Sequence, residues 1–149
     1  MYGVSKLTID ENLMMISYGD ADGAFFAQTL NRLADAGVVV DMISQTAPYG
    51  RGIRFSFTAS YNDFDTALKA LGGAGQNANP MVSGGYAKVN LYGEDMVESV
   101  GVAARALNAL GAEEIEVALI TTSDLDISIL LRQEDIDVAT ALLRNAFAL

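Results

Sequence analysis

The sequence contains no histidine, no cysteine and no tryptophan in its 149 residues. Without cysteine it can form no disulfide and perform no thiol catalysis. Histidine is the usual general base near neutral pH and a common metal ligand, so its absence excludes Ser-His-Asp triads and ordinary zinc sites. We expect no catalytic residues, no cofactor and no metal, although an enzyme that uses carboxylates, lysine or tyrosine stays open.

Basic residues are also scarce. Nine Lys and Arg stand against nineteen Asp and Glu, which gives a net charge of −10. Nucleic acid and anionic membrane surfaces both need a basic footprint, so neither is an expected partner. The sequence has no apolar run long enough for a transmembrane helix and no signal-peptide core, which predicts a cytoplasmic location.

What the sequence does contain is an internal repeat. Hydrophobic residues make up 51% of the chain, enough for a sizeable core. The strings VVVDMISQ, IRFSF and DFDTALKAL (38–45, 53–57 and 63–71) align with IEVALITT, LDISI and DIDVATALL (115–122, 125–129 and 135–143). Hydrophobic spacing predicts strands at 13–18, 38–45, 53–58, 87–92, 115–122 and 126–131, and helices at 24–36, 62–71, 102–110 and 134–147. The chain is therefore a duplicated β-α-β-β-α unit.

This repeat predicts an α+β fold with two ferredoxin-like (βαββαβ) units in tandem, whose sheets pair side by side. We expect the first unit at 11–79 and the second at 86–149, completed by an N-terminal strand at 4–9. The Gly- and Asn-rich segment 72–85 is predicted as a linker with a short strand at 81–83. Because the sheets have edges to satisfy, a dimer is also expected.

Two glycine-rich stretches do not fit ion or phosphate sites. In GDADG (19–23), Asp20 and Asp22 match the first acids of a calcium loop, but Ala24 and Asn31 occupy later ligand positions. The stretch reads better as an acidic turn before a helix, whose backbone N–H groups can hold a carboxylate ligand. GGAGQ lacks the GK[ST] ending of a phosphate loop. The acids at 63, 65, 135 and 137 are predicted to face solvent in the first turns of two helices.

Asp41 interrupts the apolar strand GVVVDMISQT. A carboxylate is costly to bury without a partner. Asp41 could face solvent, or it could lie at an interface and bind a cation such as an α-ammonium group. Strand periodicity places it on one face with Val39 and Ile43, which favours a covered site. The matching position in the second half is Ala118, so the fold itself does not need the acid.

These segments resemble the tandem ACT-domain regulatory region of aspartate kinases (aspartokinases). The first half carries an acidic turn, a helix, LADAG and VVVDMISQ at 20–45, and the second carries GEDMVESVGVAARALNAL…TTSDLDIS at 93–128. TTSDLDIS (121–128) is the most specific string. The resemblance covers nearly the whole chain.

The resemblance implies that the chain binds a free amino acid, lysine or threonine, at an interface between ACT domains, commonly between two chains. It implies feedback regulation of a kinase domain or subunit (ATP:L-aspartate 4-phosphotransferase) and a homodimer formed through ACT domains. The effector-binding positions it implies are Asp20, Asp22, Gly23, Ala24, Val40, Asp41, Met42, Ile43 and Gln45. The second-unit interface it implies consists of Thr121, Thr122, Ser123 and Asp124.

The sequence also departs from the family. The first loop has no proline, and Ser99 and Val100 replace the usual His-Pro before Gly101. Because of Ala118, we do not expect the second unit to bind an amino acid in the same way. The ATP- and aspartate-binding segments do not fit in these residues, so no catalysis is expected from this chain alone. It could be a fragment, a regulatory subunit or a stand-alone protein, and an interaction module that ignores amino acids is the alternative function.

Overall fold

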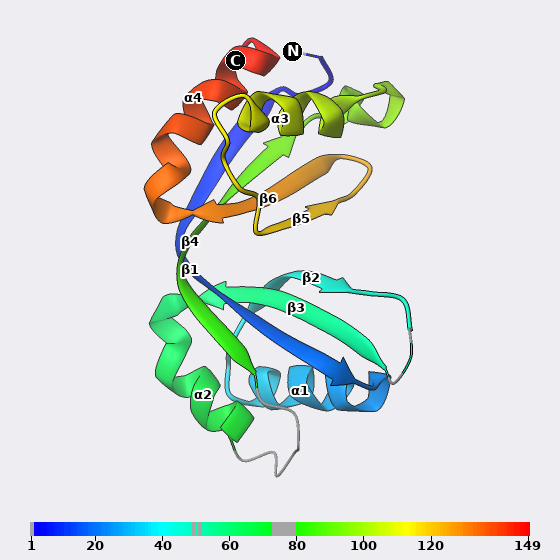
Figure 1. The fold of residues 1–149 in the computed structure, drawn as a ribbon, viewed down its shortest axis with the longest axis vertical. Helices are drawn as coiled ribbons and strands as arrows, with labels where there is room; N and C mark the ends of the chain where they lie inside the picture. Colours follow the sequence, from blue (N-terminus) through cyan, green and yellow to red (C-terminus); the bar gives the residue numbers. More distant parts are fainter. Residues whose placement is uncertain (1, 49, 51, 73–79) are drawn as a thin grey trace. The chain divides into compact units, whose positions relative to one another are not determined.

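The chain forms two compact units, which Figure 1 shows as separate groups of helices and strands. The computed structural model describes residues 2–48, 50, 52–72 and 80–149. The first unit is Asn12–Gly84, and the second combines Met1–Glu11 with Gly85–Leu149. The strands β1 and β4 are long, and each contributes residues to both units. The α+β class and the two ferredoxin-like units predicted from the sequence are confirmed.

The first unit packs two helices on an antiparallel sheet. Strand β3 lies between β2 and β1, and pairs antiparallel with both. The elements are β1 (Lys6–Ala21), α1 (Gly23–Asp35), β2 (Val40–Gln45), β3 (Ile53–Ser60), a 3-10 turn (Tyr61–Asp63), α2 (Phe64–Gly72) and β4 (Met81–Tyr92). The sheet order makes β2 an edge strand of this unit.

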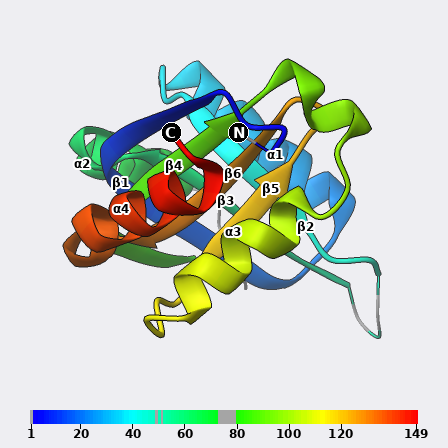
Figure 2. The ribbon, with the colours of Figure 1, turned by 90° about the horizontal axis from the view of Figure 1, so that it is seen from above.

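The second unit repeats this plan. Strand β6 lies between β4 and the short edge strand β5, again antiparallel to both. The helices α3 and α4 pack against each other on this unit, and they lie next to one another in Figure 2. The remaining elements are a 3-10 turn (Glu94–Glu98), α3 (Val102–Gly111), β5 (Leu119–Thr122), β6 (Asp126–Arg132), a 3-10 turn (Gln133–Asp135) and α4 (Ile136–Phe147).

Two pairs of predicted strands are single strands in the structure. The segments expected at 4–9 and 13–18 form β1, and those at 81–83 and 87–92 form β4. Residues with left-handed backbone lie where the breaks were predicted, Asn12 at φ 59° and Gly85 at φ 80°. Both residue types tolerate this conformation, so the strand continues past them. The predicted linker therefore reaches no further than Pro80, and residues 73–79 lie outside the described part.

The ends of several predicted elements also move; the strand predicted at 38–45, for example, begins at Val40. Strand β1 continues through Ala21, so the predicted turn at 19–23 is reduced to Asp22. Strand β5 starts at Leu119 instead of residue 115, because Ile115 and Val117 are used to pack a loop against the core. Two of the four helix acids, Asp65 and Asp137, are exposed as predicted, whereas the other two, at 63 and 135, are partly buried.

Residues at the duplicated helix positions are buried against the sheet in both units. Ala67 and Leu71 of α2 are buried against the first sheet, and Ala139 and Leu143 of α4 are buried against the second. Alternation along β3 buries Phe55 and Phe57 toward α1 and α2. Each helix thus uses one stripe of side chains to dock on its sheet.

A close backbone approach fixes the N-terminal segment in the second unit. Gly93 lies against the carbonyl of Gly3, and a Cβ atom at Gly93 would collide with that oxygen. The neighbouring Ser5 amide donates a hydrogen bond to the Tyr92 carbonyl at 2.8 Å. Glycine at position 93 is therefore required by space rather than by backbone angle.

We predict that Gly93→Ala lowers the free energy of unfolding by about 1–3 kcal/mol or more, because the methyl group displaces the Gly3 carbonyl. Gly111→Ala is the matched control: nothing lies within 4 Å of its added Cβ, and it lies in the last turn of α3. The control is expected to be neutral or stabilising by up to about 1 kcal/mol. Urea denaturation of both variants tests this, and equal stabilities would contradict it.

Candidate functional site

Asp41 lies beside an irregularity in the edge strand β2. Asp41 pairs with Thr58 and Ser44 pairs with Ser56, so Met42 and Ile43 together face only one residue of β3. Met42 has a left-handed backbone, with φ 50°, while its side chain is buried. This is a β-bulge, which twists an edge strand and re-aims its side chains, often near functional sites.

The side chains next to Asp41 form an open apolar face. Asp41 is exposed, and the nearby Val39 and Ile43 are 80% and 47% exposed. Met42, between Asp41 and Ile43, is buried, but the register places Ser44 on the same face as Asp41, so the bulge interrupts the strict alternation expected from the sequence. Large apolar side chains beside a carboxylate on an edge strand are suited to being covered by a ligand or by another chain.

The start of α1 is already capped by an acid. The Phe25 amide donates a hydrogen bond to the Asp22 carboxylate at 2.7 Å, and Asp22 has the extended backbone of an N-cap residue. Asp20, just before it, has left-handed backbone with φ 52°. A ligand carboxylate at this helix start would have to use the amides of Gly23 and Ala24, beside the negative charge of Asp22.

The strand register separates the predicted effector residues into two groups. Ala21, just before the α1 cap, pairs with Ile53, whereas Asp41 pairs with Thr58 five residues away on β3. At about 3.3 Å per residue, the two sites lie about 17 Å apart along the sheet. Gln45 pairs with Phe55 and so lies nearer the helix start, whereas Val40 and Ile43 lie near Asp41, with Ile43 in the bulge itself. One unit alone cannot present both groups to a single α-amino acid.

An aromatic cluster supports the helix start. The Tyr18 ring lies 5.1 Å from Phe25 and 5.0 Å from Phe55, and Phe26 stacks on Phe55 at 4.0 Å. The sequence analysis missed Tyr18 and Phe25 as neighbours of the site. Their signal is the Phe-Phe pair in the first turn of α1, opposite the alternating aromatic residues of β3. The cluster fixes α1 against the sheet, so the position of its N-terminus is well defined.

Burial of Tyr18 has an electrostatic consequence. The pKa of its phenol is raised above the ordinary value of 10.0, because burial disfavours the charged phenolate; the nearby Arg32 works in the opposite direction. The phenol therefore stays neutral at physiological pH and acts in this cluster as an apolar ring.

The predicted second-unit residues form a hairpin turn. Thr121 and Thr122 end β5, and the Ser123 hydroxyl donates to the Asp126 carboxylate at 2.8 Å while accepting from the Asp126 amide at 3.2 Å. Asp124 lies exposed in the turn. These hydrogen bonds give TTSDLDIS a local structural role, and its role as an interface stays a prediction.

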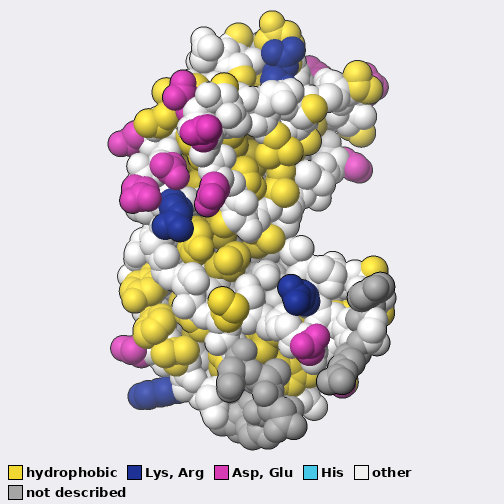
Figure 3. All heavy atoms as spheres, viewed as in Figure 1, with side chains coloured by type: hydrophobic (Ala, Val, Ile, Leu, Met, Phe, Trp, Pro, Cys, Tyr) yellow, Lys and Arg dark blue, Asp and Glu magenta, His cyan; other side chains and the backbone are white. Residues whose placement is uncertain are grey.

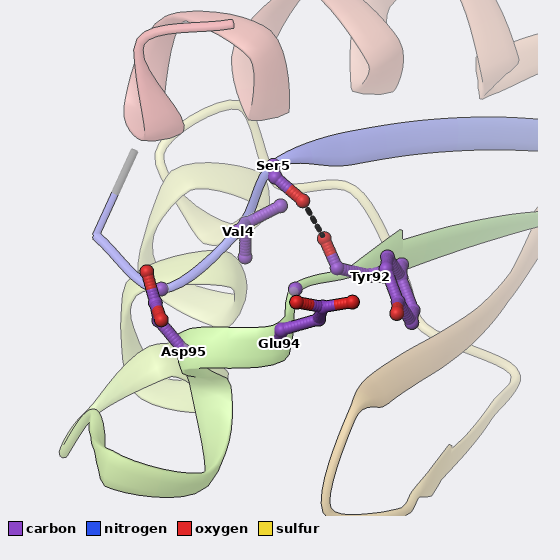
Figure 4. Close-up of a pocket in the computed structure, with 7 residues that line it drawn as sticks. Val4, Ser5, Tyr92, Glu94 and Asp95 are labelled. Atoms are coloured by element: carbon purple, nitrogen blue, oxygen red, sulfur yellow. Dashed lines mark hydrogen bonds between the residues drawn. The ribbon is translucent and has the colours of Figure 1, made fainter.

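A small pocket lies elsewhere in the second unit. It has a volume of about 230 Å³ and contains none of the predicted effector residues; Figure 4 shows Ser5, Tyr92, Glu94 and Asp95 around it. The Ser5 hydroxyl donates to the Tyr92 carbonyl at 3.4 Å. Among the described residues no group of three or more acidic side chains could hold a metal ion, and no helix could cross a membrane.

Comparison with known proteins agrees with this architecture. The model of the ACT domain family matches residues 89–147. An aspartokinase from Pseudomonas aeruginosa is 32% identical over 133 residues, which are 87% of this chain and 32% of that protein. A crystal structure of aspartokinase alpha and beta subunits is 30% identical with a TM-score of 0.88, covering 98% of this chain and 99% of that one. The chain belongs to the aspartokinase family.

A second structure places the match within that family. The regulatory subunit of aspartate kinase from Thermus thermophilus is 25% identical with a TM-score of 0.88, and 97% of this chain covers 99% of it. The chain spans about a third of the length of the curated aspartokinases it matches. It therefore corresponds to the regulatory ACT-domain region of aspartokinases.

We predict that Asp22→Ala in this aspartokinase regulatory region lowers the free energy of unfolding by about 0.5–2 kcal/mol, the usual effect of removing an N-cap acceptor. Asp22→Asn keeps an acceptor oxygen and should retain most of that stability. Thermal denaturation compares the two variants. If Asp22→Ala were as stable as Asp22→Asn, the cap would contribute nothing measurable.

The raised pKa of Tyr18 predicts a pH dependence at the alkaline end. As pH rises through about 10, the phenol ionises in the unfolded chain but stays protonated in the folded one. Ionisation lowers the free energy of the unfolded state relative to the folded state. Stability should therefore fall more steeply above pH 10 in the parent than in Tyr18→Phe. Denaturant midpoints at pH 8 and pH 10.5 measure this, and parallel losses in the two proteins would be the contrary result.

Proposed function

We propose that this chain senses a free amino acid and regulates an aspartokinase catalytic domain, either in the same polypeptide or in a separate subunit. The observation that carries the proposal is Asp41, an exposed acid at a β-bulge among apolar side chains. An α-ammonium group is a suitable partner for such a carboxylate, and Val39 and Ile43 would contact the rest of the effector.

The second unit supports this interpretation by contrast. Ala118 replaces Asp41 at the matching position, and its amide donates to the Leu130 carbonyl at 2.8 Å. The same fold therefore forms without the acid. The acid therefore has a role specific to the first unit, and effector binding is the role that we propose for it.

We propose that the complete site is formed by two copies of the chain. The helix start and Asp41 are about 17 Å apart along the sheet of one unit, much further than the ammonium and carboxylate groups of one amino acid. Asp41 of one copy would bind the ammonium group, and the amides of Gly23 and Ala24 of the other would bind the carboxylate. Pairing through the edge strand β2 would give such a homodimer.

The charges favour lysine over threonine as the effector. Asp20, Asp22 and Asp41 are acidic, and the predicted effector positions include no Lys or Arg. Two of the acids, Asp20 and Asp22, come just before the amides that would hold the effector carboxylate, so a positively charged side chain on the effector would offset their repulsion of that carboxylate. Binding across two copies would favour one arrangement of the dimer and shift its equilibrium, which is the basis of feedback control.

Calorimetry against the common amino acids tests the proposal. We expect heat on titration of lysine, or failing that threonine, and a dimer on gel filtration. Absence of binding by a folded dimer, for every amino acid tried, would reject sensing and leave the chain as an interaction module.

Asp41→Ala should weaken effector binding by roughly 2–5 kcal/mol, the range for truncating one partner of a buried charge pair. Asp65→Ala is the control, because it removes the same charge from an exposed position on α2 of the same unit. Its affinity should stay within about 0.5 kcal/mol of the parent. If Asp41→Ala binds the amino acid as tightly as the parent does, Asp41 is not part of the binding site.

A further inference from the structure

The helix α4 carries a second apolar stripe that faces away from the core. One side of the helix is buried through Ala139, Leu143 and Phe147. On the other side, Val138 is 52% exposed and Leu142 is partly buried. A shallow hollow follows this outer side and is lined by Glu113, Asp137, Val138, Ala141, Leu142 and Asn145. Val138, Ala141 and Leu142 have the spacing i, i+3, i+4 of one apolar helix face, and the polar Asn145 continues it at i+7.

The internal repeat shows that the fold does not require this stripe. In the aligned helix α2, Thr66 stands for Val138, Lys69 for Ala141 and Ala70 for Leu142. The positions that dock the helix on its sheet are unchanged, alanine and leucine being buried in both helices. The second unit therefore has an apolar outer face where the first has a polar one.

Acidic residues border this hollow. Asp137 has the counterpart Asp65 in the first unit, whereas the glutamates of the neighbouring loop are confined to the second unit. Glu113 and Asp137 line it, and Glu114 and Glu116 follow in the same loop. The repeat places Ala36, Gly37 and Val39 at the positions of these three glutamates. Acidic side chains gather over the α4 region in Figure 3, with apolar side chains between them.

Glu114 occupies a position where its residue type is unfavourable. Its backbone is left-handed, with φ 55°, and the matching residue of the first unit is Gly37 with φ 78°. Side chains other than glycine and asparagine rarely adopt this conformation. Glutamate therefore occupies this position although the backbone conformation there favours glycine.

We propose that the outer face of α4 docks an amphipathic helix of a different protein or domain, with an apolar stripe flanked by Lys or Arg. The apolar stripe supplies the contact area, and the acidic border selects basic flanks by charge complementarity. The residues of this surface belong to the second unit and those of the proposed effector site to the first, so failure of one proposal does not reject the other.

A second copy of the chain fits this face poorly. Two copies of the face placed together would set Glu113 and Asp137 against the same acids. Each of the four described helices carries a single basic residue, Arg32, Lys69, Arg105 or Arg144, so none offers basic flanks on both sides of an apolar stripe. An anionic membrane surface is disfavoured by the same acids.

The test uses the full chain and a synthetic helical peptide that has a leucine stripe flanked by lysines. A control peptide has glutamate in place of every lysine. We expect the lysine peptide to bind, with amide NMR shifts confined to α4 and residues 113–116, and binding to weaken as salt is raised. The glutamate peptide should not bind.

Three variants locate the contact. V138T/L142A gives α4 the outer residues of α2 without changing charge, and V138T/A141K/L142A completes the exchange. Both should fold, and their affinity for the lysine peptide should fall by about ten-fold or more. Leu68→Thr, which removes an exposed apolar side chain from α2, is the control and should bind like the parent.

Several results would overturn the proposal. Equal binding of the two peptides would show that the acidic border selects nothing. Equal binding by V138T/A141K/L142A and the parent would show that the lysine peptide attaches elsewhere on this acidic chain. Concentration-dependent broadening at α4 without peptide would assign the face to a second copy, and shifts at α4 with phosphatidylserine vesicles would assign it to a membrane.

Discussion

The fold of each unit depends on one helix burying an alanine and a leucine against the sheet. An alanine and a leucine four residues apart bury one side of α2 and of α4 against their sheets. Burial of such side chains is the main favourable contribution to folding, and each leucine is worth about 1.5–3 kcal/mol. Because one side of each helix is enough, the outer side of the helix and the edge of the sheet are free to differ between the units.

The differences between the units therefore indicate function more clearly than either unit does alone. Asp41 against Ala118, and Val138 against Thr66, are substitutions within one fold in one chain. The acid lies on the edge of the first sheet and the apolar stripe lies on a helix of the second. This separation suggests a division of roles, with effector binding proposed for the first unit and docking for the second.

The sequence was sufficient for features that depend on local pattern. Hydrophobic spacing located α1 and α3 to within a residue, and the repeat identified the buried pairs. It failed where a single residue overrides the pattern: Asn12 and Gly85 looked like breaks, and a left-handed Met42 has no sequence signal. The position of Asp41 relative to the α1 cap depends on strand register, which the sequence did not supply.

The negative charge of Asp41 makes the stability of the proposed dimer depend on the effector. If two copies pair so that Asp41 of one lies opposite the α1 start of the other, each Asp41 approaches Asp20 and Asp22 of the other copy, in chains that each carry a charge of −10. Like charges facing each other across an interface are destabilising. An ammonium group bound at each Asp41 would offset that repulsion, whereas the exposed Val39 and Ile43 would gain from burial in either state. The same carboxylate would then weaken the empty interface and strengthen the occupied one, which is the differential affinity that an allosteric effector needs.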